Sequence, residues 1–169
     1  MAYGTLEGGE EYHETRGNLE WLNLDEDARE AARVRASMYL DVLYAPRFPG
    51  TKTGGADQID QWPRTGATYI DGTPIASDEV PREMEWATYE AMAREQATPG
   101  SLAPDVAWDK KKVLTEVKGI KWEVIKPAED ANPLQGYLPV FPIIEGLLYP
   151  ILTGPPSASG DFSGQILVV

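Results

Sequence analysis

The chain has 169 residues and a mass of 18.6 kDa, which suffices for one domain with extensions. It has no cysteine, which excludes a disulfide scaffold, a thiolate metal site and a cysteine nucleophile. Its single histidine, His13, argues against a histidine-rich metal centre and a Ser-His-Asp triad. The 27 Asp and Glu residues outnumber the 15 Lys and Arg residues, and the resulting formal charge of −12 is unfavourable for general nucleic-acid binding.

No segment has the pattern of a signal peptide or a membrane span. The first residues lack a basic start and an apolar core, and no stretch approaches 18 consecutive apolar residues. We therefore expect a soluble protein with no membrane partner.

Charge is distributed unevenly along the chain. Residues 1–30 hold nine acids against two arginines, and six of the seven lysines lie between residues 110 and 126. Residues 131–169 carry two acids and no Lys or Arg. The acidic N-terminal part fits either an ordinary solvated helix face or a surface that repels polyanions, along which DNA would slide without adhering.

Two helices are predicted in the N-terminal part. Thr5 has the residue type of an N-cap and predicts a short helix to about Thr15, which Gly17 ends. Asp25 predicts the N-cap of a stronger helix over about residues 26–43. Acids crowd the first turn of that second helix. Its core stripe is apolar: Ala32, Ala36, Tyr39, Leu40 and Leu43.

A long connection follows and ends at a third helix. Residues 44–77 are rich in Gly and Pro, with one helical turn expected over 56–61, and connections of this length are usually functional or supported by a partner. Pro81 suits the first turn of a helix that continues to about Gln96. Its expected apolar stripe is Val80, Met84, Ala87 and Ala91.

A β-hairpin is predicted beyond the third helix. Apolar residues alternate with polar ones over 113–117 and over 120–124, around the turn dipeptide Lys118-Gly119. The alternation predicts one apolar and one charged face. The lysines of this region could contact phosphate, but Glu116 and Glu123 interleave with them, which favours a solvated face of alternating charge.

The C-terminal region is unusually apolar. Pro142 is placed to open a short helix through Tyr149, and apolar residues cover so much of its circumference that we expect the helix to be buried. A Gly/Pro/Ser linker over 154–160 precedes the strand-forming segment Gln165, Ile166, Leu167, Val168 and Val169. An apolar strand on a flexible tether is typical of β-augmentation, in which the strand adds to the sheet edge of a partner. Intramolecular packing and disorder are the alternatives.

Other candidate sites give weaker signals. The five tryptophans are scattered and lack local Arg or Lys platforms, so we expect them in the core or at subunit contacts rather than stacked on bases. We expect His13 on a helix surface. Glu10 and Glu14 share a helix face, yet nothing marks an acid–base site. We predict no enzyme, no catalytic residue, no metal and no cofactor.

Several segments in a specific order carry a resemblance to a known family. They are LNLDEDAREAARVRASMYLDVLY, RFPGTKTGG, QWPRTGA and DGTPIASDEVPREMEWATYEAMA. Together they resemble the head-tail adaptor (head-completion or connector) proteins of long-tailed phages over about residues 3–103, and the apolar helix from Leu138 also fits. Relatives of this sequence type often carry the label DnaT-like single-stranded-DNA-binding protein.

The resemblance implies a mainly α protomer that assembles into a ring, typically of twelve subunits, beneath the portal protein. Such a ring extends the DNA channel, joins the capsid to a stopper or tail-terminator protein, and lets genomic dsDNA pass without sequence-specific binding. Adaptors of this kind engage the portal through extended, often C-terminal, segments, which agrees with portal docking by Gln165, Ile166, Leu167, Val168 and Val169.

We therefore expect a structural virion protein of the phage neck, present in the host cytoplasm during assembly. The expected parts are a helical adaptor core (1–104), a β-hairpin insertion (105–130), an apolar helix packed on the core or on a neighbour (131–153), and a flexible linker with a docking strand (154–169). Loop-geometry and subunit-contact residues are expected at Arg47, Phe48, Pro49, Trp62, Pro63 and Arg64. The alternatives are a single-stranded-DNA-binding replication protein or a different neck or tail-completion ring.

Overall fold

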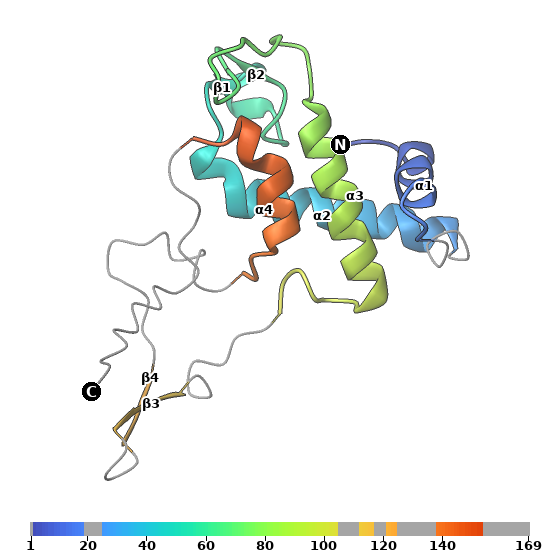
Figure 1. Ribbon diagram of the computed structural model, residues 1–169. Helices are drawn as coiled ribbons and strands as arrows, with labels where there is room; N and C mark the ends of the chain where they lie inside the picture. The colour runs from blue at the N-terminus through green and yellow to red at the C-terminus, as the bar shows by residue number, and fades with distance from the viewer. Residues whose placement is uncertain (1, 19–24, 105–111, 117–120, 125–137, 154–169) are drawn as a thin grey trace.

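The computed structural model describes residues 2–18, 25–104, 112–116, 121–124 and 138–153. Four α-helices dominate these residues, with short 3-10 turns and two small antiparallel strand pairs (Figure 1). The predicted fold class, mainly α with long loops and a β-hairpin, is confirmed. The expected C-terminal arm lies outside the described residues.

The first two helices begin at the caps that the sequence predicts. α1 spans Leu6–Glu14, and the Thr5 hydroxyl accepts a hydrogen bond from the Gly8 N–H. α2 spans Glu26–Tyr44, and the Asp25 carboxylate accepts from the Ala28 N–H. The whole predicted stripe of α2 is buried: Ala32, Ala36, Tyr39, Leu40 and Leu43.

α3 spans Arg82–Ala97, with Pro81 as its N-cap residue. It contacts each of the other helices, and Figure 1 shows α1, α3 and α4 side by side across α2. The buried side chains of α3 include Met84, Ala87, Tyr89, Ala91 and Met92. α3 is therefore the central element of the core.

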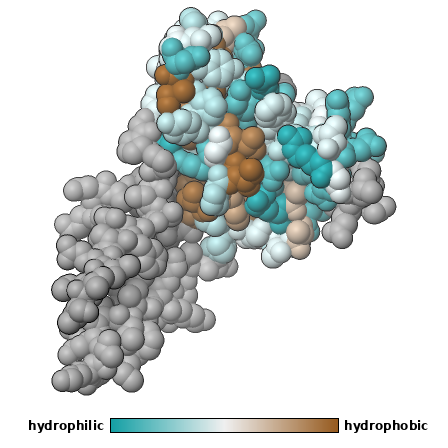
Figure 2. All heavy atoms as spheres, viewed as in Figure 1, coloured by the Kyte–Doolittle hydropathy of each residue, from teal (hydrophilic) through white to brown (hydrophobic). Residues whose placement is uncertain are grey.

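α4 spans Pro142–Leu148 and continues into a 3-10 turn, Tyr149–Ile151. Ile144, Leu148 and Ile151 are fully buried. The expectation that the helix is buried all round is wrong, because Ile143 remains 48% exposed. Figure 2 shows apolar residues gathered on the face of the molecule where α4 lies.

The long connection after α2 contains two short strands and two short 3-10 turns. Its two short strands, β1 (Thr51–Lys52) and β2 (Arg64–Thr65), pair antiparallel, and short 3-10 turns lie at Ala45–Arg47 and Gly55–Asp57. The helical turn expected over 56–61 thus begins one residue earlier and ends at Asp57.

The predicted hairpin consists of β3 (Lys112–Glu116) and β4 (Lys121–Val124), which pair antiparallel. The register places Val113 opposite Glu123 and Leu114 opposite Trp122, with an irregularity between Leu114 and Glu116. The expected separation into one apolar and one charged face concerns side chains outside the described part of the chain, and it stays a prediction.

Candidate functional site

The arginine of the W-P-R motif holds the long loop together. Arg64 is 7% exposed and donates to the carbonyls of Pro49 (2.6 Å) and Gly50 (2.7 Å) and to the carbonyl of Gln61 (3.2 Å). Its planar fork suits this task, because one guanidinium can bond several carbonyls at once. Burial lowers the pKa of Arg64 from its usual value. The R-F-P-G and W-P-R motifs are thereby tied to each other.

The R-F-P-G motif requires its glycine because the backbone there lies close to the backbone of residues 65–67. Gly50 has a φ of 67°, in the left-handed region that favours glycine. A Cβ at this position would lie 2.7 Å from the Ala67 nitrogen and would also overlap the Thr65 carbonyl oxygen. Backbone packing therefore leaves no room for a side chain here.

The remaining motif residues lie mostly inside the protein. The Trp62 and Phe48 rings, 2% and 5% exposed, meet edge to face with their centroids 5.7 Å apart. Arg47, 7% exposed, forms an ion pair with Glu145 of α4. Pro63 follows Trp62 through a cis peptide bond. The roles expected of these residues in loop geometry and in subunit contacts both stay predictions.

A partly buried carboxylate connects the N-terminal residues to the same loop. The Tyr3 hydroxyl donates to Asp41 of α2 (2.5 Å), and the Gln61 N–H donates to the second oxygen of Asp41 (3.1 Å). The Trp62 N–H donates to the Tyr3 hydroxyl (3.2 Å). Burial raises the pKa of Asp41 to about 6, against the hydrogen bonds from Tyr3 and Gln61, which lower it.

The cations of the helical part are occupied by partners in the same chain. Residues 2–18, 25–104 and 138–153 contain nineteen Asp and Glu but only nine Lys and Arg, a formal charge of −10. Six arginines form ion pairs with carboxylates, and the other three cations donate to backbone carbonyls. The six are Arg29, Arg33, Arg35, Arg47, Arg82 and Arg94. Within these ranges, phosphate would have to compete with an existing contact for each cation.

One surface combines arginines with aromatic rings. The Arg82 guanidinium lies 5.3 Å from the centroid of the Trp86 ring, and that of Arg16 lies 3.5 Å from the centroid of the Tyr12 ring. Tyr12 and Trp86 are themselves neighbours, with centroids 6.4 Å apart. The expectation that the tryptophans lack an arginine platform is therefore wrong at Trp86. The signal was the spacing of four between Arg82 and Trp86, which places both on one helix face.

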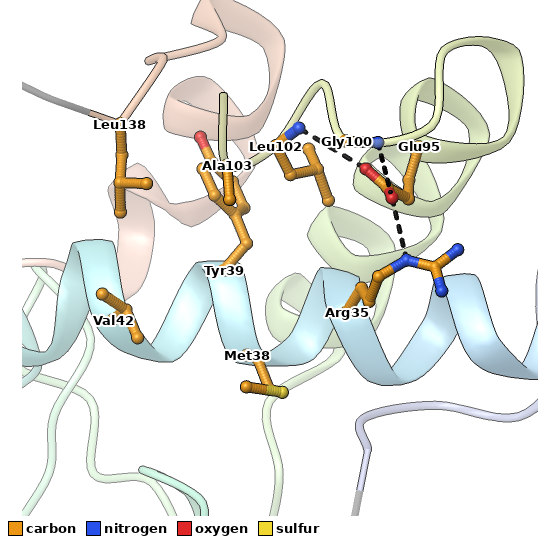
Figure 3. Close-up of a pocket in the computed structure, with 9 residues that line it drawn as sticks. All are labelled: Arg35, Met38, Tyr39, Val42, Glu95, Gly100, Leu102, Ala103 and Leu138. Carbon is orange, nitrogen blue, oxygen red and sulfur yellow. Dashed lines mark hydrogen bonds and ion pairs between the residues drawn. The ribbon is translucent and has the colours of Figure 1, made fainter. Parts of the chain in front are cut away.

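An apolar groove lies beside the outer face of α2 (Figure 3). Its volume is about 240 Å³. Leu102 and Ala103 line it from the segment after α3, and Leu138 from the segment before α4. α2 contributes Arg35, Met38, Tyr39 and Val42, and Glu95 and Gly100 complete the lining.

The outer face of α2 is apolar although it meets solvent. Val34, Met38 and Val42 are spaced by four residues and are 43%, 61% and 44% exposed. This spacing places them on one side of the helix. The spacing was visible in the sequence, but only the packing of α3 against the other stripe shows which side remains open.

The ionic groups among the described residues that line the groove, Arg35 and Glu95, are already paired with each other. The Arg35 Nε donates to Glu95 (2.8 Å), whose carboxylate also accepts from the Gly100 N–H (2.9 Å). Glu95 is 3% exposed. These bonds fix the segment after α3 over the groove and leave an apolar lining for any occupant.

The expectation that His13 is a surface residue is wrong. The ring is 3% exposed because α1 packs against α3, and its Nε2 lies 3.0 Å from the Tyr89 carbonyl oxygen. A carbonyl can only accept, so Nε2 carries the hydrogen and Nδ1 accepts from the Asn18 amide (3.3 Å). Burial lowers the pKa of His13, which favours this neutral form. Within the described ranges, no group of three or more His, Asp or Glu residues could hold a metal ion.

Several sequence-predicted site residues cannot be placed. The expected docking strand, Gln165, Ile166, Leu167, Val168 and Val169, lies outside the described residues, as do Trp21 and Trp108. Among the residues that are described, no helix is long and apolar enough to span a bilayer.

The family is shown by comparison: the model of the family described as "Putative DnaT-like ssDNA binding protein" matches residues 2–166, and the chain belongs to this family. No curated protein and no solved structure matches the chain.

Proposed function

We propose that this protein is a non-catalytic structural subunit, a head-tail adaptor that forms a ring, of about twelve copies by the resemblance, beneath a phage portal. In this role it joins the capsid to a stopper or tail-terminator protein and extends the channel through which genomic dsDNA passes. The role belongs to the virion neck, with assembly in the host cytoplasm. The resemblance of residues 3–103 to such adaptors supports it.

The observation that carries the proposal is the internal pairing of the cations. DNA-binding affinity comes largely from Lys and Arg that contact phosphate and release counterions. All nine Lys and Arg residues of ranges 2–18, 25–104 and 138–153 contact carboxylates or carbonyls of the chain, and nineteen acids surround them. A surface of this kind repels phosphate, so DNA can pass along it without binding.

A second function, binding of single-stranded DNA, is favoured by a different observation. The family description names this activity, and the neighbouring pairs Arg82–Trp86 and Arg16–Tyr12 have the chemistry of a base-stacking surface. The side chain of Arg82 is 71% exposed, so it could turn from Glu83 to a phosphate. Trp86, however, is only partly exposed and Tyr12 is 5% exposed, which limits the ring area open to a base.

An anisotropy titration with fluorescent oligothymidylate at physiological salt separates the two functions. For an adaptor we expect no saturable binding at micromolar protein. Micromolar binding that falls by about 1–3 kcal/mol in Trp86→Ala would instead establish the stacking surface. A loss caused only by the triple change Lys110→Glu, Lys111→Glu and Lys112→Glu would assign DNA binding to the lysine-rich region. Either form of micromolar binding overturns the adaptor proposal.

The positive test of an adaptor is binding to purified portal protein of the same virus. The full-length chain is mixed with the portal and followed by size-exclusion chromatography and electron microscopy. We expect a ring of the protein on one end of the portal. Failure of the folded protein to join the portal would contradict the proposal.

A further inference from the structure

The groove beside α2 has a lining suited to a segment without charged side chains. Its lining is apolar apart from Arg35 and Glu95, which satisfy each other and the Gly100 N–H. An occupant with a positive charge at this place would lose hydration without gaining a partner, because the Glu95 carboxylate already accepts from Arg35 and from the Gly100 N–H. An occupant with apolar side chains would cover Met38 and Val42, which are 61% and 44% exposed.

The chain itself contains a segment with the required chemistry. Residues 165–169 carry no charge, and four of the five are consecutive apolar residues. The acid-rich N-terminal part and the lysine-rich part between 110 and 126 do not have this composition. The apolar residues 138–152 are already used, since Ile144, Leu148 and Ile151 pack in the core.

The segment leaves the helical part at a different place from the groove. Thr153 is fixed beside Arg47, because its N–H and hydroxyl both donate to the Arg47 carbonyl (2.7 and 2.8 Å). Leu138, which lines the groove, lies at the opposite end of the segment 138–153 that contains α4. The chain therefore leaves the helical part beside Arg47, whereas Leu138 lines the groove.

The tether is long enough for such an exchange. Eleven residues, 154–164, separate Thr153 from the segment and span about 36 Å at 3.3 Å per residue when extended. An exit and a receptor at different places on one subunit give a head-to-tail contact, which closes into a ring when the rotation between subunits permits.

We propose that residues 165–169 of one copy dock in the groove between α2, the segment after α3 and Leu138 of a second copy, and so link neighbouring subunits. The inference rests on the ring of the proposed function. It assigns the segment to a neighbouring copy in place of the portal edge that the resemblance suggests. Ile166, Leu167 and Val168 supply the apolar contacts, and Met38, Val42 and Leu102 receive them.

Disulfide trapping tests this arrangement, because the chain has no natural cysteine. One sample of full-length protein carries Met38→Cys and another carries Leu167→Cys, and the two are mixed under mild oxidation. The control mixture pairs Leu167→Cys with Ile59→Cys, whose position is more exposed, at 87%, and lies outside the groove. If docking holds the two sulfurs together, we expect about ten times more covalent heterodimer from the first mixture than from the control.

A double variant, Met38→Cys with Leu167→Cys on one chain, distinguishes exchange from internal folding. Exchange predicts a ladder of covalent oligomers on a non-reducing gel. A covalent monomer alone would show that the segment folds back on its own groove and would overturn the proposal. Equal trapping at Met38→Cys and Ile59→Cys would overturn it as well.

The outcome is independent of the test of function. Trapping in a protein that also binds single-stranded DNA would sustain the exchange of segments and remove the adaptor role. A protein that joins the portal but gives no ladder would keep the adaptor role and remove the exchange. Truncation after Gly160 provides a further check, since it removes residues 161–169 and should abolish self-association while the helical signal in circular dichroism remains.

Discussion

The loop that follows α2 is held by contacts within the chain, whereas the outer face of α2 is open to solvent. In the loop, Arg47, Trp62 and Arg64 are buried although two of them are charged, and each charged group finds partners within the chain. On the helix face, Val34 and Met38 are apolar and yet remain largely in water. The buried polar groups of the loop are hydrogen-bonded, which fixes the loop. The exposed apolar groups of the α2 face have no such contacts, and a second surface could cover them.

The largest effect is expected from opening the core under the loop. Trp62→Ala removes a ring that is 2% exposed and packs against Phe48, and it should cost about 3–5 kcal/mol of folding free energy. Urea unfolding followed by circular dichroism measures the loss. Ile59→Ala, at a position 87% exposed in the same loop, is the matched control and should change stability by less than about 0.5 kcal/mol. A small effect of Trp62→Ala would show that the loop does not depend on its buried ring.

A pH-dependent effect is expected at the carboxylate that ties Tyr3 to the loop. The pKa of Asp41 is about 6 in the folded protein and 3.8 for an ordinary aspartate, so at intermediate pH the folded state binds more protons than the unfolded state. Its contribution to stability is therefore fully present below about pH 4 and is lost as the pH rises through 6. The loss amounts to about 3 kcal/mol or less.

Urea unfolding of the wild type and of Asp41→Asn between pH 4 and pH 7.5 measures this contribution as the difference between the two curves. The wild type should lose stability relative to the variant as the pH rises. A constant difference across this range would show that Asp41 has the same pKa in both states.

A smaller loss is expected from the arginine of the W-P-R motif. Arg64→Met keeps a long side chain but leaves the carbonyls of Pro49, Gly50 and Gln61 without their donor, at a cost of about 2 kcal/mol. Arg64→Lys keeps the charge but loses the planar fork, and it should recover only part of that cost. Full recovery with lysine would mean that charge, rather than the geometry of the fork, organises the loop.

The sequence allowed the helices and caps to be predicted because those signals are local. Thr5 and Asp25 cap the predicted helices with the expected hydrogen bonds, and the apolar stripe of α2 is buried as its spacing indicates. A cap or a stripe depends on residues within one or two turns. The same holds for Gly17, whose φ of 71° ends the first helical segment.

The errors concern contacts between distant residues. His13 lies on a polar-looking helix and is buried only because the Tyr89 carbonyl, 76 residues away, meets its ring. The burial of Arg64 depends on carbonyls about fifteen residues upstream, and the register of the hairpin depends on an irregularity that alternation does not predict. The groove itself required three segments to meet, so no single stretch of sequence could indicate it.

The smallest effect on stability, and the sharpest contrast, is expected on the outer face of α2. Met38→Gln and Val42→Thr should each change the free energy of unfolding by less than about 0.5 kcal/mol, because both side chains are exposed to solvent in the folded protein. Leu40→Ala, on the buried side of the same helix, should cost about 2–5 kcal/mol.

Met38→Gln should weaken self-association although it leaves stability nearly unchanged. The substitution leaves the fold intact but places a polar atom in an apolar contact between copies. Sedimentation velocity at a series of concentrations measures this for Met38→Gln, with the same change at the more exposed position Ile59, Ile59→Gln, as control. We expect weaker association in Met38→Gln alone. Equal association in both variants would show that the apolar face of α2 is ordinary exposed surface, since a face used by a second copy cannot accept a buried, unpartnered amide without losing affinity.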